Sequence, residues 1–269
     1  MVRRKKGRQM IGRKQFETLI DDHRRRHLSL WGHTWASPVH KYLYVAVGKA
    51  ACTKIKLCLH QLEGYPPLEN ASLIHDRNHP GCAFVPRLTD FTNAEAIEIL
   101  TSPEWFRFCF VRNPYYRLFS AYKSKMLNYL DPQYQPVRDE IRAKCGYPIR
   151  DGRPAGMVAF RDFVRYVEER SDPDRDFHWR SQTAIVMPGM VKYDLIGRME
   201  SFVQDFGQVL RRLNASAELI AAVPEPVNPT TKLYHAAAYD QELASRVYDM
   251  YQEDFENFGY DRDSWLFDY

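Results

Sequence analysis

The chain has 269 residues, of which 45% are hydrophobic and 14% aromatic, and it carries a formal net charge of +4. This is enough to form one sizeable α/β domain or two small ones. No run approaches the roughly 18 apolar residues of a transmembrane helix, so we expect no membrane span. No apolar segment follows the basic N-terminus, so we expect no secretory signal and a cytoplasmic location.

The positive charge is concentrated at the N-terminus. Residues 1–27 hold ten Lys and Arg against three Asp and Glu, so the rest of the chain is net negative. We interpret residues 1–35 as a basic arm with a helix over 15–28, and residues 36–269 as the folded domain. The arm is either a solvated tail or a contact for a membrane surface or an anionic polymer. Nucleic acid is not expected as a partner, because the basic residues are not interleaved with stacking aromatics.

The cysteines favour a reducing compartment and no zinc site. Their number is odd and no CxxC pair occurs among them. They are Cys52, Cys58, Cys82, Cys109 and Cys145.

Strand and helix patterns alternate along the chain, which predicts an α/β fold with a parallel sheet covered by helices on both faces. In chain order we expect strand 42–47, helix 53–62, a short strand 71–75, helix 93–100, strand 107–111, helix 114–130, helix 160–169, strand 191–196, helix 200–213 and a closing helix 236–258. Residues 131–156 mix Pro, Gly and charges irregularly, so we interpret them as a long loop that could act as a substrate lid.

The first of two strand-to-helix junctions is suited to binding a phosphate. Lys49 lies where the chain leaves a strand, and the small residues Gly48, Ala50 and Ala51 let backbone N–H groups approach an anion closely. Thr53 can cap the following helix and also donate to the anion. The Walker A pattern GxxxxGK[ST] is absent from the sequence, which disfavours ATP-type phosphoryl transfer.

The second junction places Arg112 at a strand end and Ser120 two helical turns further on. Pro114 fits the first turn of the intervening helix. Helix N-termini favour negative charge, so this junction is also suited to an anion. Two such units predict a ligand with two separated anionic groups.

These motifs resemble those of the Golgi-type carbohydrate sulfotransferases. Residues 48–54 are similar to the 5′-phosphosulfate loop of that family, and residues 112–120 to its 3′-phosphate element. Three further segments resemble its middle block and C-terminal helix, so that the resemblance spans roughly residues 40–260; they are 177–182, 192–200 and 248–260. Gly48 replaces the proline that usually precedes the loop lysine, and no membrane anchor is seen, which favours a soluble, bacterial relative.

The resemblance implies a P-loop-like, single sulfotransferase domain and sulfuryl transfer from 3′-phosphoadenosine 5′-phosphosulfate (PAPS) to a hydroxyl of a glycan or other acceptor. Lys49 would stabilise the leaving phosphate. The scheme needs no metal. The residues expected to bind the donor are Gly48, Lys49, Ala50, Ala51, Cys52, Thr53, Lys54, Arg112 and Ser120.

The acceptor hydroxyl needs a general base, and two histidines are candidates. We favour His75, because it lies at a predicted strand end and such ends face the ligand crevice. His178 is the other candidate, although with Trp179 it could instead form a platform for a sugar. Asp76 is the next candidate if neither histidine serves.

Two other functions remain open on the sequence alone. One is a nucleotide kinase with a degenerate phosphate loop, and the other is a non-catalytic binder of anionic glycans through the basic arm. No pattern in the sequence identifies the acceptor.

Overall fold

The computed structural model describes residues 17–18, 22, 31–223 and 238–266. Most of the basic arm, with the helix expected over 15–28 and the proposed surface contact, lies outside these residues. The first residues of the expected closing helix also lie outside them.

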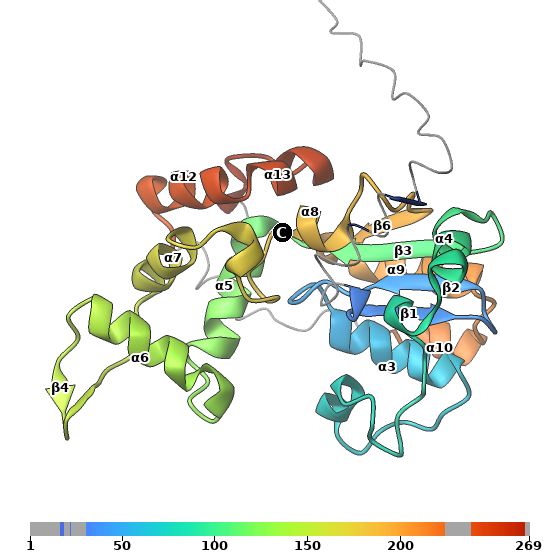
Figure 1. The fold of residues 1–269 in the computed structure, drawn as a ribbon, viewed down its shortest axis with the longest axis horizontal. Helices are drawn as coiled ribbons and strands as arrows, with labels where there is room; N and C mark the ends of the chain where they lie inside the picture. Colours follow the sequence, from blue (N-terminus) through green and yellow to red (C-terminus); the bar gives the residue numbers. More distant parts are fainter. Residues whose placement is uncertain (1–16, 19–21, 23–30, 224–237, 267–269) are drawn as a thin grey trace, which may run out of the picture.

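A four-stranded sheet forms the core of one half of the molecule (Figure 1). Its order is β1 (Thr34–Ser37), β2 (Tyr42–Val45), β3 (Phe106–Val111) and β6 (Leu195–Arg198). Strands β2, β3 and β6 are parallel, as predicted, although β6 begins four residues later than the strand expected over 191–196. Strand β1 is antiparallel to β2 and was not predicted. All four residues of β1 are buried, so no alternation of polar and apolar residues marks it in the sequence.

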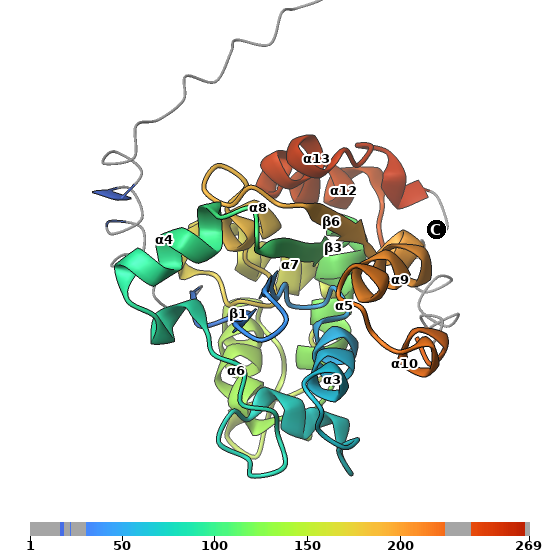
Figure 2. The same ribbon diagram turned by 90° about the vertical axis from the view of Figure 1, so that its right-hand side faces the viewer.

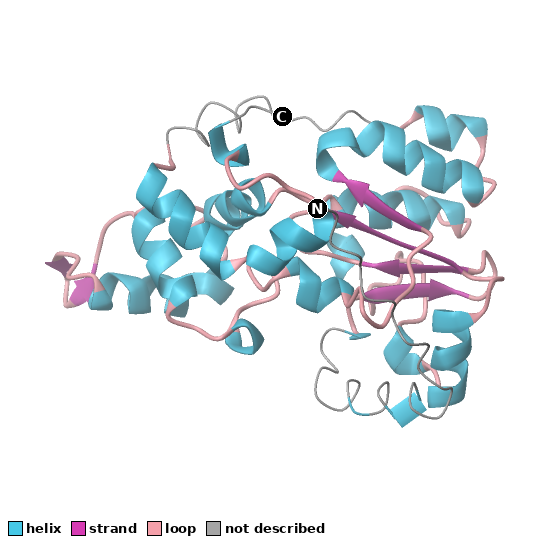
Figure 3. Ribbon diagram, turned by 90° about the horizontal axis from the view of Figure 1, so that it is seen from above, coloured by secondary structure: helices cyan, strands magenta, loops and turns pink. Residues whose placement is uncertain are grey.

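Helices flank the sheet in a single mixed α/β domain. They are α3 (Cys52–Leu62), α4 (Asn93–Thr101), α5 (Pro114–Lys125), α6 (Gln135–Lys144), α7 (Phe160–Glu168), α8 (Gln182–Val186), α9 (Phe202–Arg212), α10 (Ala217–Ala221), α12 (Gln241–Met250) and α13 (Gln252–Phe258). Figure 3 shows the four strands of this sheet gathered in one half of the molecule, with a helical half beside it. None of the helices in the described segments is long and apolar enough to cross a bilayer.

Side chains alternate between the two faces of the sheet, and each face packs on its own set of helices. Tyr44 and Phe108 lie in one apolar cluster with residues of α3 and α9, which lie close together beside α10 in Figure 2. Val45 and Cys109 lie in a second cluster with residues of α4, α5, α7 and α12. Burial on both faces explains why β2 is entirely apolar and β3 is apolar except for Arg107, whereas the edge strand β6 is less buried and ends in Arg198.

The structure differs from the sequence-based expectation in several further places. Residues 71–75 form a 3₁₀ helix, η1 (Ala71–His75), rather than a strand, because the Asn70 side chain accepts a hydrogen bond from Ser72 N at 2.9 Å and starts a turn. The closing helix is broken at Tyr251, whose φ of −124° is not helical. The packed domain also begins before residue 36, since Trp31 is fully buried.

A further difference is that the segment 131–156 is not an irregular loop. It contains the 3₁₀ helix η3 (Pro132–Tyr134), helix α6, and a hairpin of β4 (Ile149–Arg150) and β5 (Arg153–Pro154). Prolines 132 and 136 lie in the first turn of η3 and α6, where proline is favourable, so they begin helices instead of breaking them.

Candidate functional site

A cavity of about 1010 Å³ opens at the carboxyl ends of β2 and β3. Positive charge dominates its described lining, in which six side chains are Lys or Arg and two are carboxylic acids. The basic residues are Lys49, Lys54, Lys56, Arg87, Arg112 and Lys125, and the acids are Asp131 and Glu200. This imbalance suits a ligand with several negative charges.

The loop between β2 and α3 has the backbone geometry of an anion site. Lys49 and Ala51 have φ angles of 71° and 57°, in the left-handed region, and this alternation turns successive N–H groups toward one side. The first intrahelical hydrogen bond of α3 is from Ile55 N to Ala51 O, so Cys52 N and Thr53 N have no acceptor within the helix. With no acidic residue in this first turn, the helix start favours an anion.

Not every predicted loop residue reaches the cavity. Lys49, Ala51, Cys52, Thr53 and Lys54 line it. Gly48 and Ala50 do not line it. A Cβ on Gly48 would lie 3.2 Å from the Phe177 ring, and Ala50 N donates to Val47 O at 3.2 Å. These two residues therefore contribute to the conformation of the loop through contacts within the protein.

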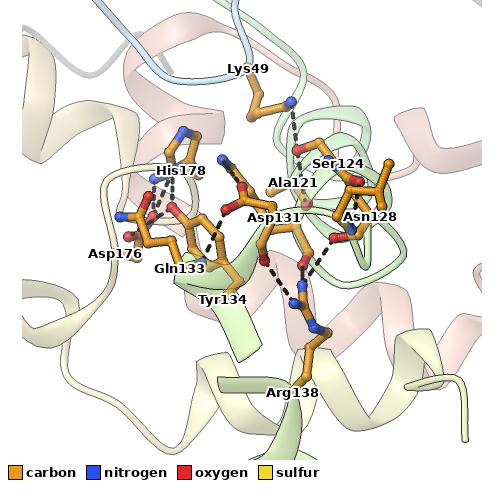
Figure 4. A network of polar contacts seen from close by, with 12 residues as sticks. Lys49, Ala121, Ser124, Asn128, Asp131, Gln133, Tyr134, Arg138, Asp176 and His178 are labelled. Atoms are coloured by element: carbon orange, nitrogen blue, oxygen red, sulfur yellow. Dashed lines mark hydrogen bonds and ion pairs between the residues drawn. The ribbon is translucent and has the colours of Figure 1, made fainter. Parts of the chain in front are cut away.

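The Lys49 amine lies inside the cavity and donates to Ser124 Oγ at 2.8 Å (Figure 4). Burial, opposed by Cys52 and reinforced by Lys125 and Arg112, lowers the pKa of Lys49 to about 8. Within the described segments no carboxylate forms an ion pair with this amine. An anionic ligand would therefore stabilise its charged form.

The second predicted element faces the same cavity. The Arg112 backbone is fixed by Gln182, whose side chain accepts from Arg112 N at 2.9 Å and donates to Arg112 O at 2.8 Å. On α5, Tyr116, Ser120 and Ser124 follow at intervals of four, so they form one stripe that lines the cavity. The structure thus brings Arg112 and Ser120 to the loop that carries Lys49, and Arg112 Nη1 donates to Lys49 O at 3.3 Å.

The His75 side chain is exposed at the mouth of the cavity, at the end of η1, and its Nε2 lies 2.9 Å from Thr53 Oγ1. Partial burial, with smaller effects from Lys56, His178 and Lys125, lowers the pKa of His75 to about 4. The reason for favouring His75 was wrong, because it does not end a strand, although it does face the ligand cavity.

His178 is held by a carboxylate. Its Nδ1 lies 2.8 Å from Asp176 Oδ1 and 3.0 Å from the Tyr134 hydroxyl (Figure 4). Burial lowers the pKa of His178, while Asp176 opposes this shift. An imidazole whose Nδ1–H donates to a carboxylate presents an unprotonated Nε2, which is the tautomer that a general base requires.

Several residues of the site belong to no recognised sequence motif and were not predicted from the sequence. His33, Lys56, Arg87 and Lys125 come from separate segments and meet only in the folded cavity. Ser124 could have been found from its spacing of four from Ser120 on a predicted helix.

Arg117 is a buried residue that connects two segments of the site. It is 2% exposed, and its guanidinium donates to Gly48 O at 2.8 Å, Arg180 O at 2.7 Å and Phe177 O at 3.2 Å. It therefore joins the loop between β2 and α3 to the segment that carries His178.

Replacing Arg117 with methionine is expected to lower the free energy of unfolding by about 2–4 kcal/mol, because buried carbonyls lose their donor. Urea unfolding measures the change. The exposed Arg211→Met variant is the matched control and should stay within about 0.5 kcal/mol of the parent. Equal stability of the two variants would contradict this role for Arg117.

The fold and the cavity define an α/β protein with a cation-rich ligand site at the carboxyl ends of its parallel strands. The chain belongs to the sulfotransferase family, whose profile matches residues 32–261. This confirms the resemblance inferred from the sequence motifs.

Individual relatives agree with the family assignment. The chain is 28% identical over 258 residues to carbohydrate sulfotransferase 10 of Xenopus laevis, covering 87% of this chain and 68% of that protein. It is 30% identical over 242 residues to carbohydrate sulfotransferase 14 of Danio rerio, covering 86% of this chain and 63% of that protein. The match to carbohydrate sulfotransferase 8 of Mus musculus is 28% identical and covers 83% and 55% of the two chains. The chain thus spans about two thirds or less of the length of these relatives, and no solved structure matches it.

Proposed function

We propose that this protein transfers a sulfuryl group from PAPS to a hydroxyl of a carbohydrate, using a P-loop-like donor site. One observation carries the proposal: the phosphate loop with Lys49 and the element with Arg112 and Ser120 open into one cation-rich cavity. Membership of the sulfotransferase family and relatives named carbohydrate sulfotransferases support the same reaction class.

The donor groups of the cavity suit a nucleotide with phosphate at both ends. The start of α3 and Thr53 would hold the 5′-phosphosulfate through N–H and hydroxyl donors. Arg112 would bind the 3′-phosphate as a charge-assisted fork, with Ser120 as a single donor. In the described segments no group of three or more His, Cys, Asp or Glu side chains is arranged to hold a metal ion.

The reaction is an in-line displacement at sulfur. The acceptor oxygen forms a new S–O bond while the bond to the bridging phosphate oxygen breaks, and the acceptor proton passes to a base. Negative charge grows on the bridging oxygen, and the Lys49 ammonium stabilises that charge selectively in the transition state. His178 is the base that we favour, because Asp176 orients it, and His75 is the alternative.

A thermal-shift comparison tests the donor site against the two other functions. A ligand of micromolar affinity at millimolar concentration stabilises the folded state by roughly 4 kcal/mol. We expect this effect from 3′-phosphoadenosine 5′-phosphate and not from ATP or heparin. Stabilisation by ATP alone would favour the kinase, and by heparin alone the glycan binder. Transfer of labelled sulfate to a panel of glycans then tests the full reaction.

Arg112→Ala should reduce the preference for a nucleotide with a 3′-phosphate by roughly 2–4 kcal/mol, because the phosphate loses a partly buried cation. Isothermal titration with adenosine 5′-phosphate and its 3′-phosphorylated form measures this preference. Ser120→Ala removes one neutral donor and should cost only about 0.5–1.5 kcal/mol. If the unmutated protein binds both nucleotides equally, the 3′-phosphate site is wrongly assigned.

We also propose that the segment 131–156 covers the acceptor. Asp131 at its start lines the cavity, and the fully buried Arg138 donates to Asp131 O at 2.7 Å and to Lys125 O at 2.8 Å (Figure 4). These contacts fix the start of the segment to the end of α5.

A further inference from the structure

The Asp176 carboxylate that holds His178 has a second partner, the hydroxyl of Tyr134. This hydroxyl donates to Asp176 Oδ2 at 3.3 Å and lies 3.0 Å from His178 Nδ1 (Figure 4). His178 lines the cavity, whereas Tyr134 and Asp176 are not part of its described lining. His178 thus faces the ligand, and the other two side chains support it from within the protein.

The hydrogen-bonding capacity of these three groups places their protons. A carboxylate accepts but does not donate, and Asp176 Oδ1 lies 2.8 Å from His178 Nδ1, so Nδ1 carries a proton. A protonated Nδ1 cannot accept from Tyr134, so the Tyr134 hydroxyl donates to Asp176 Oδ2. The carboxylate stays ionised, because burial raises the pKa of Asp176 but hydrogen bonds from His178 and Tyr134 outweigh this effect and lower it.

The Tyr134 ring is held in one orientation. The residue is 3% exposed, its ring meets the Trp179 ring edge-on with centroids 5.9 Å apart, and Lys125 Nζ lies 4.4 Å from the ring centroid. Tyr134 ends η3, and Asp131 starts this helix by accepting from Gln133 N at 3.2 Å. Lys125 also pairs with Asp131 at 3.2 Å, so it contacts both ends of η3. The hydroxyl of a ring fixed in this way points to one place.

The contact joins two segments that are distant in the sequence. Tyr134 belongs to the segment 131–156, which we propose covers the acceptor, and Asp176 lies 42 residues further on. The Tyr134 hydroxyl therefore reaches Asp176 only when this segment is seated against the rest of the domain. Arg138 secures that seating, because its buried guanidinium donates to carbonyl groups of Lys125 and Asp131. The orientation of His178 thus depends on the same segment that would exclude water from the acceptor.

We propose that Tyr134 is a positioning residue for the general base, and that its hydroxyl holds the Asp176 carboxylate so that His178 Nε2 stays unprotonated and faces the acceptor hydroxyl. This inference rests on the proposed function, because it assigns the base to His178. Tyr134 gives up no proton in the reaction: His178 Nε2 takes the acceptor proton, and Asp176 stabilises the imidazolium that forms. The segment that covers the acceptor thereby also orients the base.

Tyr134→Phe removes the hydroxyl and keeps the ring, so it tests the inference with little change in packing. We expect kcat with the best acceptor of the glycan panel to fall about 10- to 100-fold, since a misplacement of about 1 Å costs up to the larger factor. KM for PAPS should stay within about twofold, because the donor site is unchanged. In the His178→Ala background the same substitution should change the rate by less than about twofold, because a residue that acts through His178 then has nothing to position.

The pKa of His178 gives a readout that a role in packing alone would not move. Without the Tyr134 hydroxyl, the Asp176 carboxylate keeps more of its negative charge for the imidazole, so the pKa of His178 should rise in Tyr134→Phe. The other charged and titratable groups around His178 are unaltered in this variant; they are Lys49, Lys125, His33 and His75. NMR titration of the free protein with ¹⁵N-labelled histidine measures the shift, and His178→Ala identifies the signal.

Tyr42→Phe is the matched control, because the Tyr42 hydroxyl also donates to a carboxylate, Glu63 at 2.9 Å, but at the end of β2 opposite the cavity. It should change neither kcat nor the pKa of His178. Failure of the parent to bind 3′-phosphoadenosine 5′-phosphate or to sulfate any glycan would overturn the proposed function and this inference with it. If the parent transfers sulfate, three results would each overturn this inference alone: near-normal turnover of Tyr134→Phe, no rise in the pKa of His178, or an equal loss of rate with and without His178.

Discussion

Replacing Lys49 with alanine is expected to lower kcat by about 10²-fold or more. The Lys49 amine is the cation that would meet the charge developing on the bridging oxygen, and loss of one such contact has this magnitude. Affinity for the product nucleotide should fall far less, because the start of α3, Arg112 and Ser120 remain. Alanine is suitable because Lys49 has a φ of 71°, and a glycine there would also relax the backbone. Steady-state turnover with labelled donor measures the effect.

The pH dependence gives a second readout for Lys49. With a pKa of about 8 in the free protein, the amine loses its charge as pH rises through that value. The alkaline limb of kcat/KM should therefore lie near pH 8 in the parent and disappear in Lys49→Ala. In the pH profile of kcat, the alkaline limb should lie at higher pH, since a bound phosphate stabilises the ammonium form of Lys49 and raises its pKa. Near-normal turnover of Lys49→Ala, in a variant whose melting temperature is unchanged, would show that another group stabilises the leaving phosphate.

Replacing His178 with alanine is expected to lower kcat by about 10²- to 10⁴-fold, the range for loss of a general base. Nucleotide binding should be nearly unchanged, because the base faces the acceptor. A base must be neutral, and the pKa of His178 lies below its ordinary 6.5 through burial, so the parent should lose activity only as pH falls below that value. His75→Ala is the matched comparison at the same cavity and should retain more turnover.

Asp176→Asn distinguishes a base held by a carboxylate from a histidine that only supports the structure. Asp176 raises the pKa of His178 against burial, so its neutralisation should move the acidic limb of the pH profile to lower pH. A purely structural role would lower activity without moving that limb. If His75→Ala loses turnover and His178→Ala does not, the base is His75. If both retain it within a few-fold, a carboxylate such as Asp76 becomes the candidate.

The local motifs of the site could be predicted from the sequence because they depend on short stretches of chain. A strand end, small residues around Lys49 and a helix start at Cys52 lie within a few residues of one another, and so do Arg112 and Ser120. The strands β2 and β3 were predicted for a similar reason, since burial on both faces makes β2 entirely apolar and β3 apolar except for Arg107.

Other features could not be predicted because they depend on which segments pack together. Strand β1 pairs at the edge of the sheet, and its sequence shows no strand pattern. Residues 71–75, expected as a strand, form η1 because the Asn70 side chain accepts a hydrogen bond from Ser72 N. The pairing of His178 with Asp176 depends on a turn between them, and the spacing of the two residues alone does not define its geometry.

The sequence by itself determined the α/β class, the two strand-to-helix junctions that line the cavity, and the family. Each rests on local backbone preferences and on residues close in the chain, so tertiary context was not needed to detect it. Only the tertiary structure decided that His33, Lys56 and Arg87 meet beside the candidate bases, and that the acids nearby are already engaged. Charges from three distant segments interact through space, and the fold sets their distances.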